Sequence, residues 1–385
     1  MSFRADDIVF FFGAGVSAPF GIPTMKGFVT DFENFLKNEG TPDERKTYRS
    51  IKGILETRLK KEIDLEDIFT VIDGITELTL EKIGILPLYI YSASKIPSIP
   101  HYNDSDLTTC RSLVKKFQSF VRERCQIPNE TDHKRIAEVY QDFFNRLWFE
   151  SENKSSNYLR SQNYFYCRNW SIFTTNYDMC LESFWRGRVG PQGGLNTGFR
   201  LDESKNRWLL SPDRLFGAEK VKLLKLHGLI SWQIEQDGTV TEEQTLGSSL
   251  IGRKYVEQMM IYPIQQKELY LEPYISMFKL LNSELKEKKI WIVVGYSFND
   301  PIIREIFIRN SKKDKLIIYV HPQAQYIRND KLKNVEGRFC PISKKFGEEI
   351  TFRQVNYSIV SILKPQPSFS PQKTPTQVGS SIAFR

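Results

Sequence analysis

Five short apolar segments, each closed by a turn-forming or polar residue, constrain the fold of this chain more than any other feature. They are "DIVFFFGAG", "WSIFTTNYD", "VKLLKLHG", "KIWIVVGYS" and "KLIIYVHP". Each is rich in β-branched or aromatic residues, which predicts a strand, and helix-like segments such as "PIIREIFIRN" lie between several of them. The runs at residues 8–12 and 290–294 are almost continuously apolar, as expected for strands covered on both faces. The sequence therefore predicts an α/β fold with a doubly wound, parallel, Rossmann-like sheet.

The segment from residue 31 to residue 163 has a different pattern and predicts a mostly helical module inserted between the first two strands. Two stretches in it carry apolar residues at helical spacing. The first stripe is Leu113, Val114, Phe117, Phe120 and Val121, and the second is Ile136, Val139, Tyr140, Phe143, Phe144 and Leu147. We therefore expect residues 1–30 and 164–364 to form the Rossmann-like domain. Residues 365–385, rich in Pro, Ser, Gln and Thr, predict a flexible C-terminal tail.

Composition excludes several classes of protein. The chain has 385 residues, of which 40% are hydrophobic and 26% charged, so it is long enough for two folded domains. No apolar run reaches bilayer length and no signal-peptide pattern is present, so a cytoplasmic location without membrane contact is expected. The net charge is +8, but basic residues are mostly mixed with acidic ones, as in "LETRLKKEIDLED", so direct binding of nucleic acid is not expected.

The cysteines predict neither a disulfide framework nor a metal site. The chain has five, none of them in a CxxC pair: Cys110, Cys125, Cys167, Cys180 and Cys340. Structural zinc sites cluster their ligands, and these residues are widely spaced. We therefore expect no bound metal.

The first strand ends in a glycine turn that favours a nucleotide site. The spacing Gly13-x-Gly15-x-x-Ala18 fits the dinucleotide fingerprint, in which glycines bring backbone N–H groups close to a pyrophosphate. Ser17 adds a hydroxyl donor. Pro19 and Pro23 interrupt the helix that normally follows such a turn. The pattern therefore predicts a glycine turn followed by a kinked loop.

Two polar residues stand out at the ends of other predicted strands. In open α/β sheets, ligands bind outside the carboxyl ends of the strands. Asn176 and His227 follow apolar runs directly. Glycine and proline at such places fit an ordinary turn, whereas an asparagine and a histidine fit one less well. Both are therefore candidate functional residues.

Four motifs in chain order resemble those of the sirtuin family. They are "GAGVSAPFGIPTMKGF", "FTTNYD", "KLHG" and "VVGYSFND", and "YVHP" lies where that family contacts the adenosine end of NAD. The resemblance implies that Asn176, His227 and Asp178 are catalytic. In the family, the loop after the glycines is a mobile flap over NAD. The residues that the resemblance assigns to NAD binding are Gly13, Ala14, Gly15, Ser17, Ile22, Pro23, Thr175, Gly295, Ser297 and His321.

Departures from the family pattern narrow the implied activity. Protein-deacylating sirtuins carry a four-cysteine zinc module, and no such spacing exists in this sequence. Thr175, Tyr177 and "GYSFNDP" are similar to the bacterial antiphage branch, whose members hydrolyse NAD. The resemblance thus implies an NAD+ glycohydrolase that releases nicotinamide and ADP-ribose and depletes cellular NAD during infection. It also implies a HerA-like hexameric ATPase or an Argonaute-type protein as partner. We further expect a homo-oligomer assembled through the helical insert or the tail.

The implied chemistry gives each candidate a role beside a structural alternative. Cleavage of the nicotinamide–ribose bond passes through an oxocarbenium-like state, as in glycoside hydrolysis. Asn176 can fix a water or a ribose hydroxyl, and His227 can act as a general base. Asp178 can accept a hydrogen bond from the carboxamide or instead cap the following helix. Ser297 and Asn299 could likewise cap the helix that begins near Pro301.

Three other functions remain open on the sequence alone. An NAD-dependent protein deacylase would release nicotinamide only when an acylated peptide is present. A non-catalytic module would bind NAD or ADP-ribose without turnover. A dehydrogenase, the most distant alternative, would transfer hydride, but an acidic residue closing a second strand is missing; Asp31 and Glu33 lie in a helix-like segment.

Overall fold

The computed structural model describes residues 5–59, 63–76, 104–127, 130–145, 147, 169–189, 195–204, 207–217, 221–235, 237–242, 257–260 and 272–363. Its main sheet has seven strands in the order β12-β11-β10-β1-β2-β6-β3, and all neighbours pair in parallel. The strands are β1 (Ile8–Phe12), β2 (Trp170–Thr174), β3 (Leu195–Asn196), β6 (Val221–Lys225), β10 (Ile290–Val294), β11 (Leu316–Val320) and β12 (Arg338–Ile342). The predicted parallel α/β fold is confirmed.

The strand order creates a switch point at the centre of the sheet. The chain moves outward from β1 through β2 to β6, then returns to the other side of β1 and continues through β10, β11 and β12. Between β1 and β10 the winding therefore reverses direction. In doubly wound folds, ligands bind in the crevice at this point, beyond the carboxyl ends of the strands.

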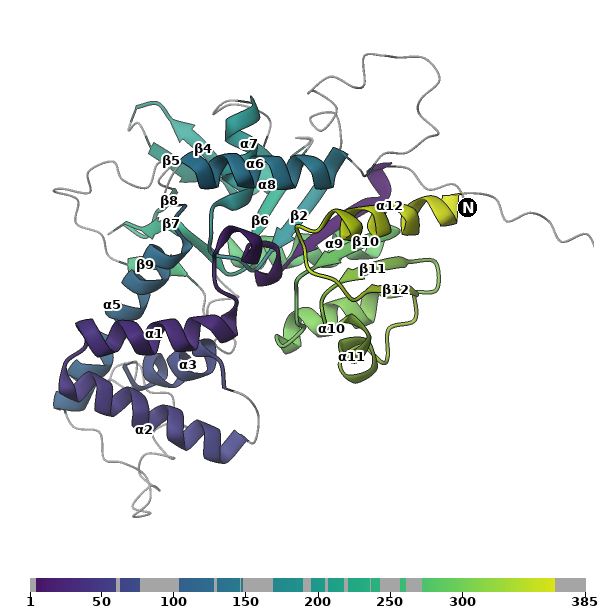
Figure 1. Ribbon diagram of the computed structural model, residues 1–385. Helices are drawn as coiled ribbons and strands as arrows, with labels where there is room; N and C mark the ends of the chain where they lie inside the picture. Colours follow the sequence, from purple (N-terminus) through teal and green to yellow (C-terminus); the bar gives the residue numbers. More distant parts are fainter. Residues whose placement is uncertain are drawn as a thin grey trace, which may run out of the picture.

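Helices cover both faces of the sheet, as the apolar strands predicted. Successive side chains of a strand point to opposite faces. The Phe10 ring packs at 5.6 Å from Phe144 of α6 (Glu130–Asn145), and the Phe11 ring packs at 5.1 Å from Phe307 of α10 (Pro301–Asn310). The other helices around the two sheets are α7 (Cys180–Val189), α8 (Pro212–Leu215), α9 (Tyr274–Glu287), α11 (Ala324–Asp330) and α12 (Glu349–Leu363) (Figure 1).

Four helices between β1 and β2 form a separate cluster beside the sheet (Figure 1). They are α1 (Met25–Glu39), α2 (Pro42–Leu59), α3 (Leu65–Thr76) and α5 (Asp104–Cys125). Phe32 is fully buried in this cluster, with the rings of Tyr48, Phe69, Phe117 and Phe120 at 5.1 to 5.8 Å. The residues of both predicted stripes are buried or partly buried, and all of them are helical except Leu147, which lies beyond the end of α6.

The helix α6 lies within the predicted insert but packs on the main sheet. Phe143 contacts Phe12 of β1 and Phe352 of α12 at ring distances of 6.1 and 5.3 Å. This helix therefore serves as part of the crossover between β1 and β2. The boundaries at residues 31 and 163 stay a prediction. The predicted tail at residues 365–385 and Cys167 lie outside the described residues.

A second, antiparallel sheet was not predicted from the sequence. Its order is β4-β5-β8-β7-β9, built from β4 (Phe199–Asp202), β5 (Arg207–Leu210), β7 (Gly228–Ile234), β8 (Val240–Glu242) and β9 (Glu257–Met260). These strands are mostly short, and β5 is half-buried at every position, so period-two alternation is weak. Asp237-Gly238, a pair that favours hairpin turns, lies between the antiparallel strands β7 and β8, and Gly238 has φ of +80°.

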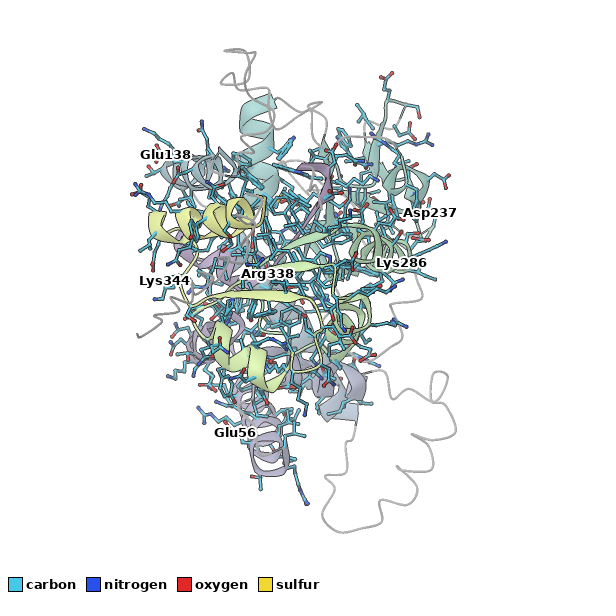
Figure 2. All side chains as sticks on the ribbon, turned by 90° about the vertical axis from the view of Figure 1, so that its right-hand side faces the viewer. Glu56, Glu138, Asp237, Lys286, Arg338 and Lys344 are labelled. Atoms are coloured by element: carbon cyan, nitrogen blue, oxygen red, sulfur yellow. The ribbon has the colours of Figure 1, made fainter. Side chains whose placement is uncertain are left out.

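The surface carries charges of both signs. Glu56 on α2, Glu138 on α6 and Lys286 on α9 are exposed, as are Arg338 and Lys344 (Figure 2). Four cysteines in the described part of the chain, Cys110, Cys125, Cys180 and Cys340, are free thiols. In the same part of the chain, no helix is both long enough and apolar enough to cross a bilayer.

Candidate active site at the carboxyl edge of the parallel sheet

The chain after β1 forms two short 3-10 turns instead of a regular helix. These are η2 (Ala14–Val16) and η3 (Ala18–Phe20), and Gly21 then takes a left-handed conformation with φ of +82°. The first α-helix begins only at Met25. This agrees with the kinked loop expected from the two prolines. Ile22 is buried and Pro23 half-buried in this loop.

The glycines of the first turn allow close contact with the turn after β10. A Cβ atom on Gly13 would lie 2.6 Å from the Gly295 carbonyl oxygen, and one on Gly15 would lie 2.7 Å from the Gly295 Cα. The N–H groups of Gly13 and Gly15 already donate to the carbonyls of Val294 and Gly295, at 2.9 and 3.0 Å. The glycines thus join β1 to β10 at the switch point, and their role in binding a phosphate stays a prediction.

A chain of hydrogen bonds links the first turn to the loop after β2. Asn176 Nδ2 donates to the Gly13 carbonyl at 3.1 Å and to Ser17 Oγ at 2.9 Å. Ser17 Oγ donates in turn to Asp178 Oδ2 at 2.6 Å. Asp178 Oδ1 accepts from the Cys180 N–H at 2.9 Å, at the start of α7, so the capping alternative is realised. Both oxygens of Asp178 therefore accept hydrogen bonds from other residues of the protein.

This chain fixes the orientation of the Asn176 amide. The Gly13 carbonyl can only accept, so the amide nitrogen must face it. The amide oxygen Oδ1 then points elsewhere, and it is buried with no hydrogen-bond partner among the described residues. Asn176 thus presents a free acceptor at the end of β2. Thr175 is half-buried beside it, and its N–H donates to the Phe12 carbonyl at 3.3 Å.

His227 occupies the equivalent position on the neighbouring strand. Thr174 of β2 pairs with Lys225 of β6, and Asn176 and His227 each lie two residues beyond this pair. The Leu226 N–H donates to the Thr174 carbonyl at 2.8 Å, which keeps the strand ends together. The His227 side chain is buried, and in the part of the chain that the structure describes its Nδ1 atom has no hydrogen-bond partner. Two unpartnered polar atoms of the described residues, Asn176 Oδ1 and His227 Nδ1, therefore lie at the ends of adjacent strands.

A carboxylate that the sequence analysis missed faces the other nitrogen of this histidine. Asp300 Oδ2 lies 3.4 Å from His227 Nε2, and the two side chains are only 12% and 6% exposed. Asp300 Oδ1 accepts from the N–H groups of Ile302 and Ile303, so Asp300 caps α10. The capping role considered for Ser297 or Asn299 is therefore wrong.

Asp300 is held in its ionised form. Burial by itself favours the neutral acid and would raise its pKa. The hydrogen bond and charge of His227, with the backbone N–H groups of Ile303 and Ile302, outweigh burial and lower the pKa below 3.8. The motif "GYSFND" contained this aspartate, but nothing in its spacing connects it with a histidine more than seventy residues earlier.

A buried ion pair supports the loop that carries Asn176 and Asp178. Lys225 Nζ lies 3.2 Å from Glu182 Oε1, and these side chains are 3% and 1% exposed. Lys225 Nζ also donates to the backbone carbonyls of Asn176 and Asp178. The lysine at the end of β6 therefore fixes the backbone at the end of β2.

The remaining predicted residues lie at the ends of β10 and β11. Lys331 Nζ donates to the Ser297 carbonyl at 3.0 Å. The His321 ring stacks on Tyr319, with centroids 5.9 Å apart, and its Nδ1 accepts from the Gln323 N–H. Burial and then the charge of Lys331 lower the pKa of His321. The Gln325, Arg328 and Lys333 side chains line a surface hollow that contains none of the predicted site residues.

Hydrogen bonds thus connect four of the predicted residues directly: Gly13, Ser17, Asn176 and Asp178. Gly295 lies against Gly15, and His227 lies just beyond the end of the neighbouring strand β6. Within the described residues, no group of three or more His, Cys, Asp or Glu side chains could hold a metal ion. The expected absence of a metal stays a prediction. The arrangement can accept hydrogen bonds from hydroxyl groups or water and can move a proton.

Comparison with known proteins identifies one domain family. Residues 171–337 match the family model described as a SIR2-like domain. No curated protein matches the chain. Among solved structures, a mutant Sir2 homologue in complex with ADP-ribose is 14% identical with a TM-score of 0.42, covering 93% of this chain and 94% of its own. A Sir2 homologue in complex with NAD is 12% identical with a TM-score of 0.41, covering 92% and 90%.

Proposed function

Because the chain contains a domain of the SIR2-like, or sirtuin-like, family, we propose that it is an NAD+ glycohydrolase. The reaction cleaves the bond between nicotinamide and ribose. One water is consumed, and nicotinamide, ADP-ribose and a proton are released. NAD is the substrate, and no metal takes part.

The observation that carries this proposal is the pair of buried, unpartnered polar atoms at neighbouring strand ends. Asn176 Oδ1 and His227 Nδ1 both lack a partner within the described part of the protein. Leaving such atoms buried and unpaired costs about 1–3 kcal/mol each, so a bound ligand or water that satisfies them is expected. The ribose hydroxyls of NAD and a hydrolytic water are donors of the required kind.

Each residue takes a role that follows from its contacts. Asn176 Oδ1 accepts a hydrogen bond from a ribose hydroxyl or from the attacking water. His227 acts as general base on a ribose hydroxyl or on that water as positive charge develops on the ribose. Asp178, whose oxygens hold Ser17 and the Cys180 N–H, positions Asn176 through Ser17. It is a positioning residue in this proposal rather than a partner of the carboxamide.

The NAD molecule lies along the carboxyl edge of the sheet in this proposal. On the side of β1 and β2 it is bordered by the first turn, the loop after it and the end of β2, that is, by Gly13, Ala14, Gly15, Ser17, Ile22, Pro23 and Thr175. Gly295, Ser297 and His321 border it on the β10 and β11 side. The switch point between β1 and β10, where these two groups meet, supports this placement.

The resemblance to the antiphage branch supplies the biological part of the proposal. The chain acts in the cytoplasm, as a homo-oligomer, and depletes NAD to stop phage replication. A HerA-like hexameric ATPase or an Argonaute-type protein controls it, because unregulated loss of NAD would kill the cell. Mass measurement of the purified chain, alone and with each candidate partner, tests this assembly.

Product analysis tests the proposed reaction. Purified full-length chain is mixed with NAD, with and without an acetylated peptide, and the products are separated by chromatography. We expect nicotinamide and ADP-ribose in equal amounts whether or not peptide is present. Release of nicotinamide only with peptide would identify a deacylase, and binding of NAD without turnover, also with the candidate partners, would identify a binding module.

A further inference from the structure

The loop between β10 and α10, residues 295–300, is held in a strained conformation. Phe298 has φ of +55°, a left-handed value that a bulky side chain adopts only when its surroundings enforce it. Its ring is buried against Tyr296, Phe307 and Tyr319, with centroids 4.9 to 5.7 Å away. Strain of this kind gathers at functional sites, so the loop has a task beyond linking two elements.

Three consecutive carbonyls of this loop are fixed by side chains from elsewhere. The Tyr319 hydroxyl donates to the Tyr296 carbonyl at 2.6 Å. Lys331 Nζ donates to the Ser297 carbonyl, and Arg304 Nη1 donates to the Phe298 carbonyl, both at 3.0 Å. The loop is therefore a rigid support for the residue at its end, which is Asp300.

Asp300 follows β10 in the chain, but its side chain reaches His227, which follows β6. The strands β1 and β2 lie between β10 and β6 in the sheet, yet Asp300 Oδ2 lies 3.4 Å from His227 Nε2. Its other oxygen, Oδ1, accepts hydrogen bonds from the Ile302 and Ile303 N–H groups at the start of α10, at 2.8 and 3.1 Å. The helix cap thus fixes the direction in which the free carboxylate oxygen points.

We propose that Asp300 is a positioning residue that fixes His227 in the Nε2–H tautomer and makes Nδ1 the nitrogen that accepts the proton during NAD hydrolysis. The role of Nδ1 as base rests on the proposed function, whereas the tautomer does not. An ionised carboxylate has no proton to donate, so the nitrogen that faces it must carry one. The second nitrogen then keeps its lone pair, and in this chain that nitrogen is the buried, unpartnered Nδ1.

The substitution Asp300→Asn separates this role from helix capping. Asparagine caps helices as well as aspartate does, so Oδ1 still accepts from Ile302 and Ile303. The amide group that then faces His227 is a donor, which requires an unprotonated Nε2 and moves the proton to Nδ1. Asp300→Ser also keeps a cap but removes the group facing His227. Asp213→Asn, on an exposed residue of α8, is the matched control.

Histidine ¹⁵N NMR on the full chain measures the tautomer without any need for activity. The chain has only four histidines, and His227→Asn assigns the relevant signals by their loss. We expect the Nε2–H pattern for His227 in the native chain and in Asp213→Asn. We expect the Nδ1–H pattern in Asp300→Asn and a mixture in Asp300→Ser. The same pattern in the native chain and in Asp300→Asn would overturn the proposal, whatever the activity.

Nicotinamide release supplies the second measurement. An inverted tautomer should lower kcat by about 10²–10⁴-fold, since the base would present a proton in place of its lone pair, and KM should change little. An inverted tautomer with unchanged kcat would also overturn the assignment of Nδ1. If the native chain releases no nicotinamide either alone or with the candidate partners, the proposed function fails, and the NMR result still decides how Asp300 orients His227.

Discussion

At the scale of single residues, the proposed function depends on polar atoms that are buried without a hydrogen-bond partner among the described residues. The Asn176 amide nitrogen donates two hydrogen bonds within the protein, yet its amide oxygen has no partner among the residues that the structure describes. His227 has the Asp300 carboxylate at one ring nitrogen and, within the described ranges, no partner at the other. Each unsatisfied buried polar atom lowers stability, so a ligand or water that satisfies these two is expected. Both atoms belong to residues two positions beyond the paired ends of β2 and β6, which marks this edge of the sheet as the candidate site.

His321 should make the stability of the chain depend on pH in mildly acidic solution. Burial, followed by the charge of Lys331, lowers its pKa below 6.5 in the folded chain. As pH falls through 6.5, the unfolded chain therefore binds a proton at this histidine before the folded chain does. The free energy of unfolding then decreases, until the pH falls below the lowered pKa and the effect levels off.

Urea denaturation at a series of pH values between 7.5 and roughly 5 measures this effect, and the variant His321→Asn isolates it. Asparagine keeps an acceptor for the Gln323 N–H that His321 Nδ1 binds. We expect the native chain to lose more stability than the variant as the pH falls. Equal losses in both proteins would show that His321 is not a buried neutral group.

At the scale of elements, the contact between the turns after β1 and β10 should tolerate no Cβ atom. In Gly15→Ala the new methyl would lie 2.7 Å from the Gly295 Cα, and no flexible side chain can move aside. We expect a loss of about 1–3 kcal/mol in the free energy of unfolding and a large loss of NAD hydrolysis, because both turns border the switch point.

The matched control for this substitution is Gly53→Ala in α2. Nothing lies within 4 Å of a Cβ atom at Gly53, and alanine favours a helix interior by about 0.5–1 kcal/mol. Gly53→Ala should therefore keep or increase stability, as measured by thermal or urea unfolding. A chain that tolerates Gly15→Ala as well as Gly53→Ala would not have the observed contact between β1 and β10.

The loop after β2 should depend on the ion pair beneath it. In Lys225→Met the buried Glu182 carboxylate loses its partner, which we expect to cost about 3–5 kcal/mol in the free energy of unfolding. Lys225→Met combined with Glu182→Leu should recover most of that loss. It should not recover NAD hydrolysis, because the carbonyls of Asn176 and Asp178 still lack their donor.

An exposed ion pair provides the comparison. Arg353 and Glu349 on α12 are 68% and 57% exposed, and breaking such a pair costs roughly 0.5 kcal/mol or less. Urea denaturation of Arg353→Ala should therefore give nearly the native free energy of unfolding. A similarly small effect of Lys225→Met would show that the buried pair does not support the loop.

At the scale of the whole molecule, five strands of the main sheet were predictable because each lies in a largely apolar segment closed by a polar residue or glycine: β1, β2, β6, β10 and β11. The edge strands β3 and β12 were not predicted, since β3 has two residues and β12 is mostly exposed or half-buried. A parallel fold brings those ends to one edge, so the sequence alone predicts that Asn176 and His227 lie near each other. The register of β2 and β6 gives both residues the same position beyond the paired strands.

What could not be predicted depends on contacts between distant segments. Asp300 reaches His227 only because Tyr319, Lys331 and Arg304 hold the loop before it. The packing of α6 on the sheet, apart from the other helices of the insert, depends on Phe10 and Phe12 and not on a local pattern. The second sheet was missed because its strands are short and its half-buried positions blur the alternation.

The central claim is that Asn176 and His227 act together on the nicotinamide–ribose bond of NAD. The most direct test is the rate of nicotinamide release by Asn176→Ala and His227→Ala, with Asn329→Ala and His133→Ala as exposed controls of the same residue types. We expect the first two variants to fold and to lose about 10²–10⁴-fold in rate, and the controls to keep the native rate. Rates within a few fold of the native chain in both Asn176→Ala and His227→Ala would contradict the account.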